Sequence, residues 1–238
     1  MTRAAEPPTN DHADRAPDAR GRRRARRQLR VVVTAGPTRE HIDPVRYLSN
    51  ESSGRMGFAI AAEASRRGHR VALVSGPVNL PTPPGVRRID VESARDMLVA
   101  VQRAFRGADA LYMAAAVADW RPARRLSGKW RAKDGGAARA KIELVKNPDV
   151  LATVARGKGP RIVVGFALET GNGERRARSK MMKKGLDYVV LNDASALNAT
   201  TSSATLIGRD GTRQVLPQKK KQQLARVLVD LAETWPRT

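Results

Sequence analysis

The chain has 238 residues with a formal net charge of +22, and 41% of them are hydrophobic. These values suit one large domain with an aliphatic core, because only 4% of the residues are aromatic. No apolar run reaches the roughly 18–20 residues of a membrane helix, and no apolar signal region opens the chain. With no cysteines, disulfides and thiolate chemistry are excluded, and we expect a cytoplasmic protein.

The positive charge is spread along the chain, since residues 1–30 account for only +5 of it. It is compatible with nucleic-acid binding, with several phosphate-bearing ligands, or with solvated arginine side chains. Aromatic residues hardly interleave with the basic ones, so nucleic acid is disfavoured. Residues 1–28 lack hydrophobic periodicity and are rich in Pro, Asp and Arg, and we expect a disordered tail there.

From residue 30 onward, strand and helix patterns alternate. The strands are continuous apolar runs such as VVV and IVVGF, which is typical of parallel strands buried on both faces. We therefore expect residues 29–238 to form an α/β domain, a three-layer αβα Rossmann-like fold with a doubly wound, mostly parallel sheet. In chain order, the expected strands are 30–34, 70–74, 110–116, 141–145, 161–166 and 188–191, and the expected helices are 54–67, 93–105, 149–155 and 174–184.

The last part of the domain has a different pattern. Residues 204–207 and 214–216 flank an Asp210-Gly211 turn that predicts a β-hairpin of type I′. An amphipathic helix is expected at 219–234. Residues 119–141 lack periodicity and are rich in Gly, Arg and Lys, which is typical of a flexible loop at an active site or of disorder.

Residues 33–61 carry the clearest functional signal. A short strand runs into a Gly/Ser/Asn-rich loop that feeds a helix, and such a loop can hold phosphate on backbone N–H groups at the positive end of the helix dipole. A purely structural loop is equally compatible with this pattern. The motifs G-x-G-x-x-G and G-x-x-x-x-G-K-[ST] are absent, which disfavours ordinary dinucleotide and P-loop sites.

Distinctive residues also follow four of the predicted strands. Because ligands of open α/β sheets bind at the carboxyl ends of strands, we expect these residues to form one site. Asp119 could bind ribose or a metal ion, or could cap a turn. Ala114–Ala116 could admit a flat base or could pack a helix, and Lys129 could reach a triphosphate or be one lysine of a basic loop. The strand ends carry Gly36, Asn50 to Gly54, Ala114 to Asp119, Phe166 and Asn192-Asp193.

Seven segments occur together and in order: TAGPTRE, IDPVRYLSNESSGRMGF, LVSGPVNLPTP, AAAVADWRP, KNPDVL, VGFALET and KGLDYVVLND. From about residue 30 to 235 the chain thereby resembles the phosphopantothenoylcysteine synthetase family, also called phosphopantothenate–cysteine ligases, of coenzyme A biosynthesis. The resemblance implies that 4′-phosphopantothenate is joined to cysteine through an acyl-nucleotide, with CTP or ATP as co-substrate, Mg²⁺ and no flavin. It also implies a homodimer, and a separate decarboxylase that would act beside this ligase.

The resemblance also suggests roles for single residues. Asn50 matches the asparagine that handles the acyl-nucleotide, and Lys129 matches a catalytic lysine of a flexible loop near the partner's site. The loop's later lysines differ from the family pattern, which leaves its full activity open. Non-catalytic nucleotide or RNA binding is the alternative function. The matched positions for nucleotide and phosphate are Gly36, Ser52, Ser53, Gly54, Ala115, Ala116, Asp119 (ribose or Mg²⁺), Phe166, Lys180 and Lys183.

Overall fold

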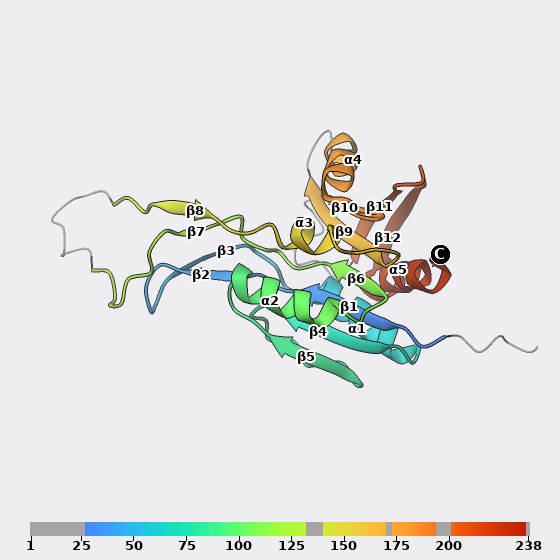
Figure 1. Cartoon of the computed structure of the whole chain (residues 1–238), viewed down its shortest axis with the longest axis horizontal. Coiled ribbons are helices and arrows are strands. Elements are labelled where there is room, and N and C mark those ends of the chain that lie inside the picture. Colours follow the sequence, from blue (N-terminus) through green and yellow to red (C-terminus); the bar gives the residue numbers. More distant parts are fainter. Residues whose placement is uncertain (1–26, 132–139, 170–172, 194–200, 237–238) are drawn as a thin grey trace, which may run out of the picture.

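The computed structural model describes residues 27–131, 140–169, 173–193 and 201–236. Its centre is an eight-stranded sheet in which six strands are parallel and two, at one edge, are antiparallel (Figure 1). The strands are β1 (Arg30–Ala35), β4 (Arg70–Ser75), β5 (Val86–Asp90), β6 (Ala110–Met113), β9 (Ile162–Glu169), β10 (Tyr188–Asp193), β11 (Thr201–Gly208) and β12 (Arg213–Lys220).

The order across the sheet is β12-β11-β10-β9-β6-β1-β4-β5. The chain starts in the middle at β1, builds outward through β4 and β5, and then returns to the other side of β1 with β6, β9 and β10. This is the strand order of the doubly wound Rossmann fold, and its direction reverses between β1 and β6. The reversal point is where open α/β sheets bind their ligands.

Helices cover both faces of the sheet, which confirms the predicted three layers (Figure 1). Alternate residues of β1 point to opposite faces: Val31 and Val33 pack against α1 (Arg55–Arg66) and α5 (Lys221–Thr234), whereas Val32 packs on the other side. That second side carries α2 (Ala94–Phe105), α3 (Val150–Ala155) and α4 (Gly173–Lys184).

Local sequence explains where the helices begin. Before α2, the Ser93 hydroxyl accepts the Asp96 N–H at 3.2 Å and the Asp96 carboxylate accepts the Ser93 N–H at 3.0 Å, which is a capping box. Asp149 accepts the Ala152 N–H at 2.9 Å and so caps α3. In contrast, α1 starts after Gly54 with no side-chain cap.

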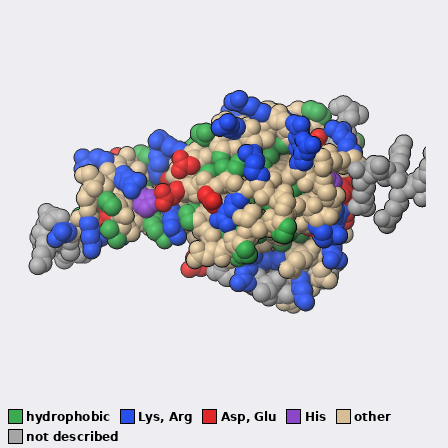
Figure 2. Space-filling view, turned by 90° about the horizontal axis from the view of Figure 1, so that it is seen from below, with side chains coloured by type: hydrophobic (Ala, Val, Ile, Leu, Met, Phe, Trp, Pro, Cys, Tyr) green, Lys and Arg blue, Asp and Glu red, His purple; other side chains and the backbone are tan. Residues whose placement is uncertain are grey.

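A long projection leaves the body of the domain, to the left in Figure 1 and Figure 2. It consists of residues 39–49, 120–131 and 140–146, and we call it the arm. Its strands form two antiparallel pairs, β2 (Arg39–His41) with β3 (Tyr47–Ser49) and β7 (Trp120–Pro122) with β8 (Leu144–Lys146).

Several expected bounds require correction. The third predicted strand, 110–116, ends at Met113, because the N–H groups of Ala115 and Ala116 donate instead to the end of β1 and to the loop after it. The strand expected at 141–145 is β8, Leu144–Lys146. The hairpin is confirmed, but residues 209–212 separate its strands, so its turn is longer than a two-residue type I′ turn.

Four strands were not expected from the sequence: β2, β3, β5 and β7. The disordered tail predicted for residues 1–28 lies almost wholly outside the described residues and stays a prediction, as do the limits of the ligase domain and the flexibility of the loop 119–141. In the described segments, no helix is both long and apolar enough to cross a membrane.

Candidate active site at the switch point

Hydrogen bonds tie β1 and β6 together beyond the ends of their ladder. The Ala115 N–H donates to Thr34 Oγ1 at 3.1 Å, and the Ala118 N–H donates to Thr38 Oγ1 at 3.0 Å. Between them the Ala116 N–H donates to the Gly36 carbonyl oxygen at 2.9 Å. The loops after both strands are therefore held as one rigid edge at the point where the sheet order reverses.

The start of α1 lies directly against this edge. Gly54 has a left-handed φ of 72°, and a Cβ on it would come within 3.2 Å of the Gly36 nitrogen. A Cβ on Gly57 would meet the Ala35 Cβ and the Thr34 carbonyl oxygen, both at 2.6 Å. Only glycines allow the helix to approach so closely, and the approach places its uncapped N–H groups beside the cleft.

Two neighbouring cavities open at this edge. The first, which we call the switch-point cleft, has a volume of about 570 Å³ and is lined by Asn50, Ser52, Ala115, Ala116 and Asp119 together with Phe166, Lys180 and Asn192. The second, the side pocket, has a volume of about 560 Å³ and shares Ala115, Asp119, Phe166 and Lys180 with the cleft. The structure thus brings together most of the residues predicted from four strand ends.

Asn50 and Lys180 are positioned by backbone carbonyl groups. The Asn50 Nδ2 donates to the Ala116 carbonyl oxygen at 3.3 Å, and the Lys180 Nζ donates to the Phe166 carbonyl oxygen at 2.7 Å. Asn50 and Asp119 are exposed, whereas Phe166 and Lys180 are half-buried. The cleft therefore offers a neutral amide, a carboxylate, an aromatic ring and an ammonium to one ligand.

The side pocket is lined by the start of α3 and by one face of α4. The Lys184 Nζ lies 2.7 Å from Asp149 Oδ2. Burial of the Asp149 carboxyl opposes ionisation, but the Ala152 N–H and Lys184 outweigh it and lower the pKa of Asp149. Asn147 is held by its own amide, which donates to the Ala118 carbonyl oxygen at 2.9 Å.

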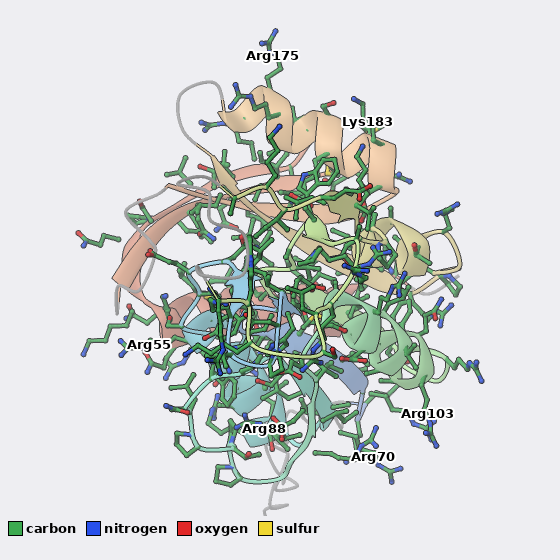
Figure 3. The ribbon with its side chains drawn as sticks, turned by 90° about the vertical axis from the view of Figure 1, so that its left-hand side faces the viewer. Arg55, Arg70, Arg88, Arg103, Arg175 and Lys183 are labelled. Atoms are coloured by element: carbon green, nitrogen blue, oxygen red, sulfur yellow. The ribbon has the colours of Figure 1, made fainter. Side chains whose placement is uncertain are left out.

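Other predicted residues lie elsewhere. Ser53 lines a separate surface pocket together with Arg39, Arg55 and Arg88, and Gly36 lies behind the lining of the cleft as a backbone position. Lys183 is exposed on α4 and points away from the body of the domain (Figure 3). Lys129 lies in the arm, in a cavity lined by Ile42 and Ala123 and not in the cleft of the same chain.

A buried carboxylate holds the two halves of the arm together. Asp43 accepts the N–H groups of Val45 and Arg46 at 2.7 Å each and the Trp130 N–H at 3.1 Å. The Arg46 guanidinium donates to Asp43 Oδ2 and to the Trp130 carbonyl oxygen. Burial would raise the pKa of Asp43, but these hydrogen bonds lower it well below its usual range.

Lys184 lies in the side pocket, although no role was predicted for it from the sequence. The spacing alone could not single it out, because residues three and four apart on a helix share a face, and both Lys183 and Lys184 fit this spacing from Lys180. Lys146 and Asn147 also line the side pocket and belong to the segment KNPDVL, which was noted without a residue role.

A magnesium ion was predicted at Asp119. In the described segments, no group of three or more His, Cys, Asp or Glu side chains could hold a metal ion. Mg²⁺ is usually held by one or two carboxylates together with phosphates and waters. The carboxylate of Asp119, which lines the cleft, would therefore suit a Mg²⁺ ion that arrives on a polyphosphate.

Known proteins resemble this chain in sequence and in fold. The chain is 46% identical over 209 residues to the coenzyme A biosynthesis bifunctional protein CoaBC of Escherichia coli K12, a match that covers 86% of this chain and 51% of that protein. It is 42% identical over 196 residues to the protein of the same name from Bacillus subtilis, covering 80% of this chain and 48% of that one. The chain thus spans about half the length of these relatives.

Among solved structures, the C-terminal domain of a coenzyme A biosynthesis bifunctional protein CoaBC superposes with a TM-score of 0.76 at 38% identity and covers 88% of this chain and 96% of that one. The sequence profile of one family matches residues 26–234, nearly the whole described domain. The chain belongs to that family, the DNA/pantothenate metabolism flavoprotein C-terminal domain.

Proposed function

We propose that this domain is a phosphopantothenate–cysteine ligase of coenzyme A biosynthesis. The observation that carries the proposal is the convergence of Asn50, Asp119, Phe166 and Lys180 on one cleft at the switch point. The relatives' name, a bifunctional protein of coenzyme A biosynthesis, and the half of those proteins that this chain matches support the same activity.

In the first proposed step, a carboxylate oxygen of 4′-phosphopantothenate attacks the α-phosphorus of CTP. The new C–O–P linkage gives an acyl-nucleotide, and the bond to the β-phosphate breaks with release of pyrophosphate. In the second step, the amine of cysteine attacks the acyl carbon and loses a proton, the amide bond forms, and CMP leaves with the electron pair of the broken C–O bond. Both substrates are anions, so positioning and charge neutralisation are the main tasks.

Asn50 suits the acyl-nucleotide because its amide is neutral. It can donate to a phosphoryl or acyl oxygen without adding a permanent charge that would hold the leaving nucleotide. Its hydrogen bond to the Ala116 carbonyl oxygen fixes the side chain at the mouth of the cleft. We infer that Asn50 orients the mixed anhydride for the attack of cysteine.

The cationic groups of the site would hold the nucleotide. Lys180 and Lys184 lie on one face of α4 and line the side pocket beside the ring of Phe166. Mg²⁺ bound to the triphosphate, next to Asp119, would supply further charge neutralisation. The proposal includes no flavin, and it assigns the reaction to the cytoplasm.

Lys129 would act across a homodimer, because it lies in the arm and not in the cleft of its own chain. In the partner's cleft, its ammonium could stabilise the charge that develops on the phosphoryl group. The arm would then be both the dimer contact and the carrier of one catalytic group.

Turnover tests the proposal directly. Purified protein with CTP, Mg²⁺, 4′-phosphopantothenate and cysteine is expected to release pyrophosphate and to form a product with the mass of phosphopantothenoylcysteine. Omission of cysteine should prevent the product, and ATP assayed in parallel decides the nucleotide. Absence of product with both nucleotides would overturn the proposed function.

A further inference from the structure

Lys221 is a buried lysine at the inner end of the switch-point cleft. It is the first residue of α5, it is 9% exposed, and it lines the same cavity as Asn50 and Asn192. No other lysine whose side chain the structure describes is buried. The buried acids of the same part of the chain have structural roles, such as Asp43 in the arm and Asp187 with Lys158 at 2.6 Å, whereas Lys221 lies at the ligand cavity.

A charged lysine at this position is destabilised by its surroundings. A lysine at the first turn of a helix meets the positive end of the helix dipole, where an acidic residue would be more stable. Burial, and then the nearby charge of Arg55, lower the pKa of Lys221, because both disfavour the charged form of its ammonium. Arg55 is itself the first residue of α1, so two helix starts and two basic side chains meet here.

The other charged groups that line the cleft have both signs. The cavity is also lined by the carboxylates of Glu51 and Asp119, both exposed, and by the ammonium of Lys180. A multiply charged anion in the cleft would relieve the repulsion between the cations and would raise the pKa of Lys221. Exposed lysines such as Lys220, the residue before it, carry no comparable penalty.

We propose that Lys221 is a phosphate-binding residue of the cleft, in addition to the lysines of α4. The inference rests on the proposed function, which brings two phosphate sources to this cavity: the triphosphate of the nucleotide and the phosphate of 4′-phosphopantothenate. The ammonium of Lys221 binds one of them at the end of the cleft that is formed by the starts of α1 and α5.

Calorimetric titration of three proteins tests the assignment: the unmodified chain, Lys221→Met, and Lys220→Met as a matched control with the same change at the adjacent exposed position. The ligands are inorganic pyrophosphate, CTP with Mg²⁺, and 4′-phosphopantothenate, with pantothenate as the counterpart without phosphate. Lys221→Met should weaken one phosphate ligand by about 10- to 100-fold, as expected for a lost charge-assisted hydrogen bond, and Lys220→Met by less than about threefold.

The ligands distinguish the phosphate sources. A loss confined to pyrophosphate and CTP assigns Lys221 to the triphosphate, and a loss confined to 4′-phosphopantothenate assigns it to that substrate. Equal affinities of Lys221→Met and the unmodified chain for all three would overturn the inference. The titrations contain no cysteine and therefore measure binding alone. A protein that binds these ligands but forms no amide in the turnover assay would contradict the proposed function and leave this inference standing.

If the Lys221→Met protein does not fold, proton uptake on ligand binding tests the assignment instead. Titration in buffers of different ionisation enthalpy, at about pH 8 to 10, should show that the unmodified chain takes up protons when it binds the phosphate ligand. Lys221→Arg should show less uptake, because its guanidinium is always charged. Equal uptake by both proteins would overturn the inference.

Discussion

Three glycines bring the first helix against the end of the first strand. Gly36 and Gly54 allow the loops to approach each other, and Gly57 lets α1 touch Ala35 and Thr34. In dinucleotide-binding Rossmann folds, the glycines of one short motif share these tasks. Here residues 37–53 separate the first glycine from the other two, so the short motif is absent while the same backbone geometry is present.

Asn50 gives the sharpest prediction for a single residue. Removal of its amide in Asn50→Ala should leave part of the pyrophosphate release, because the α-phosphate is still attacked, and should lower amide formation by about 100-fold, because the acyl-nucleotide is no longer oriented. Pyrophosphate release and product formation are measured on the same reaction. Equal losses in both would refute the role in the second step.

At the scale of an element, α4 separates lysines that face the side pocket from lysines that face water. Lys180 and Lys184 line the side pocket, whereas Lys183 points outward (Figure 3). The sequence predicted Lys183 in place of Lys184, because a run of adjacent lysines does not reveal which of them shares the face of Lys180. The phase of the helix against the sheet decides this, and it depends on packing between α4 and strands far away in the sequence.

Paired variants of α4 test this assignment. Lys184→Met should raise the KM for CTP by about tenfold, since a cation beside the phosphates and the Asp149 contact are lost. Lys183→Met removes the same charge from the adjacent exposed position and should leave KM within about twofold. Similar KM values for the two variants would show that Lys184 acts only through the overall charge of the protein.

The pair α1 and α5 is linked by a network of charged residues at the opposite end from the cleft. Arg67 of this network lies within 2.5 Å of Asp230 and 2.9 Å of Glu233, and Glu63 lies 2.7 Å from both Arg66 and Arg67. Hydrogen bonds from Arg66 first, and then from Arg67, outweigh burial and lower the pKa of Glu63 to about 2.

This shift predicts a specific acid sensitivity. The folded-state pKa lies below the ordinary value of 4.5, so the stabilisation by Glu63 is complete above about pH 4.5 and is lost as the pH falls toward about 2. Urea unfolding over this range should show a shallower loss of stability for Glu63→Gln than for the unmodified chain. Glu51→Gln, at an exposed position, is the control, and identical pH slopes for all three proteins would contradict the assignment.

Most of the body of the domain was predictable, for a physical reason. Strands such as β1 and β9 are continuous apolar runs, which mark parallel strands without knowledge of their partners. In β5, Arg87 and Arg88 interrupt that pattern, which an edge strand tolerates because one side of it lies open. The strands of the arm have three residues each, too few for any period, and they exist only through pairing.

At the scale of the whole molecule, the arm carries a large share of the exposed apolar side chains. Five of the nine large hydrophobic side chains that are exposed in the described segments lie in it, although it is the smaller part of the chain. Exposed apolar surface of this kind marks interaction sites. The predicted homodimer would bury it. The five side chains are Val45, Tyr47, Trp120, Ile142 and Leu144.

Light scattering tests the dimer. The unmodified protein should show twice the chain mass of 25.9 kDa. Val45→Asp should shift it toward the monomer, because burial of a carboxylate in an apolar contact is costly. Val99→Asp is the matched control, since Val99 is exposed at 66% on α2 and Val45 at 58% on the arm. A monomeric unmodified protein would exclude the dimer.

A mixing experiment asks whether the two chains of the dimer share an active site. Asn50→Ala and Lys129→Ala should each form very little amide product alone, since one removes a group of the cleft and the other a group of the arm. If Lys129 acts in the partner's cleft, random exchange of subunits makes half of the dimers mixed, and each mixed dimer has one of its two sites intact. The mixture should then regain about a quarter of the unmodified activity, as the symmetry of a two-fold dimer requires. If Lys129 served the cleft of its own chain, every site in the mixture would lack one group and no activity would return.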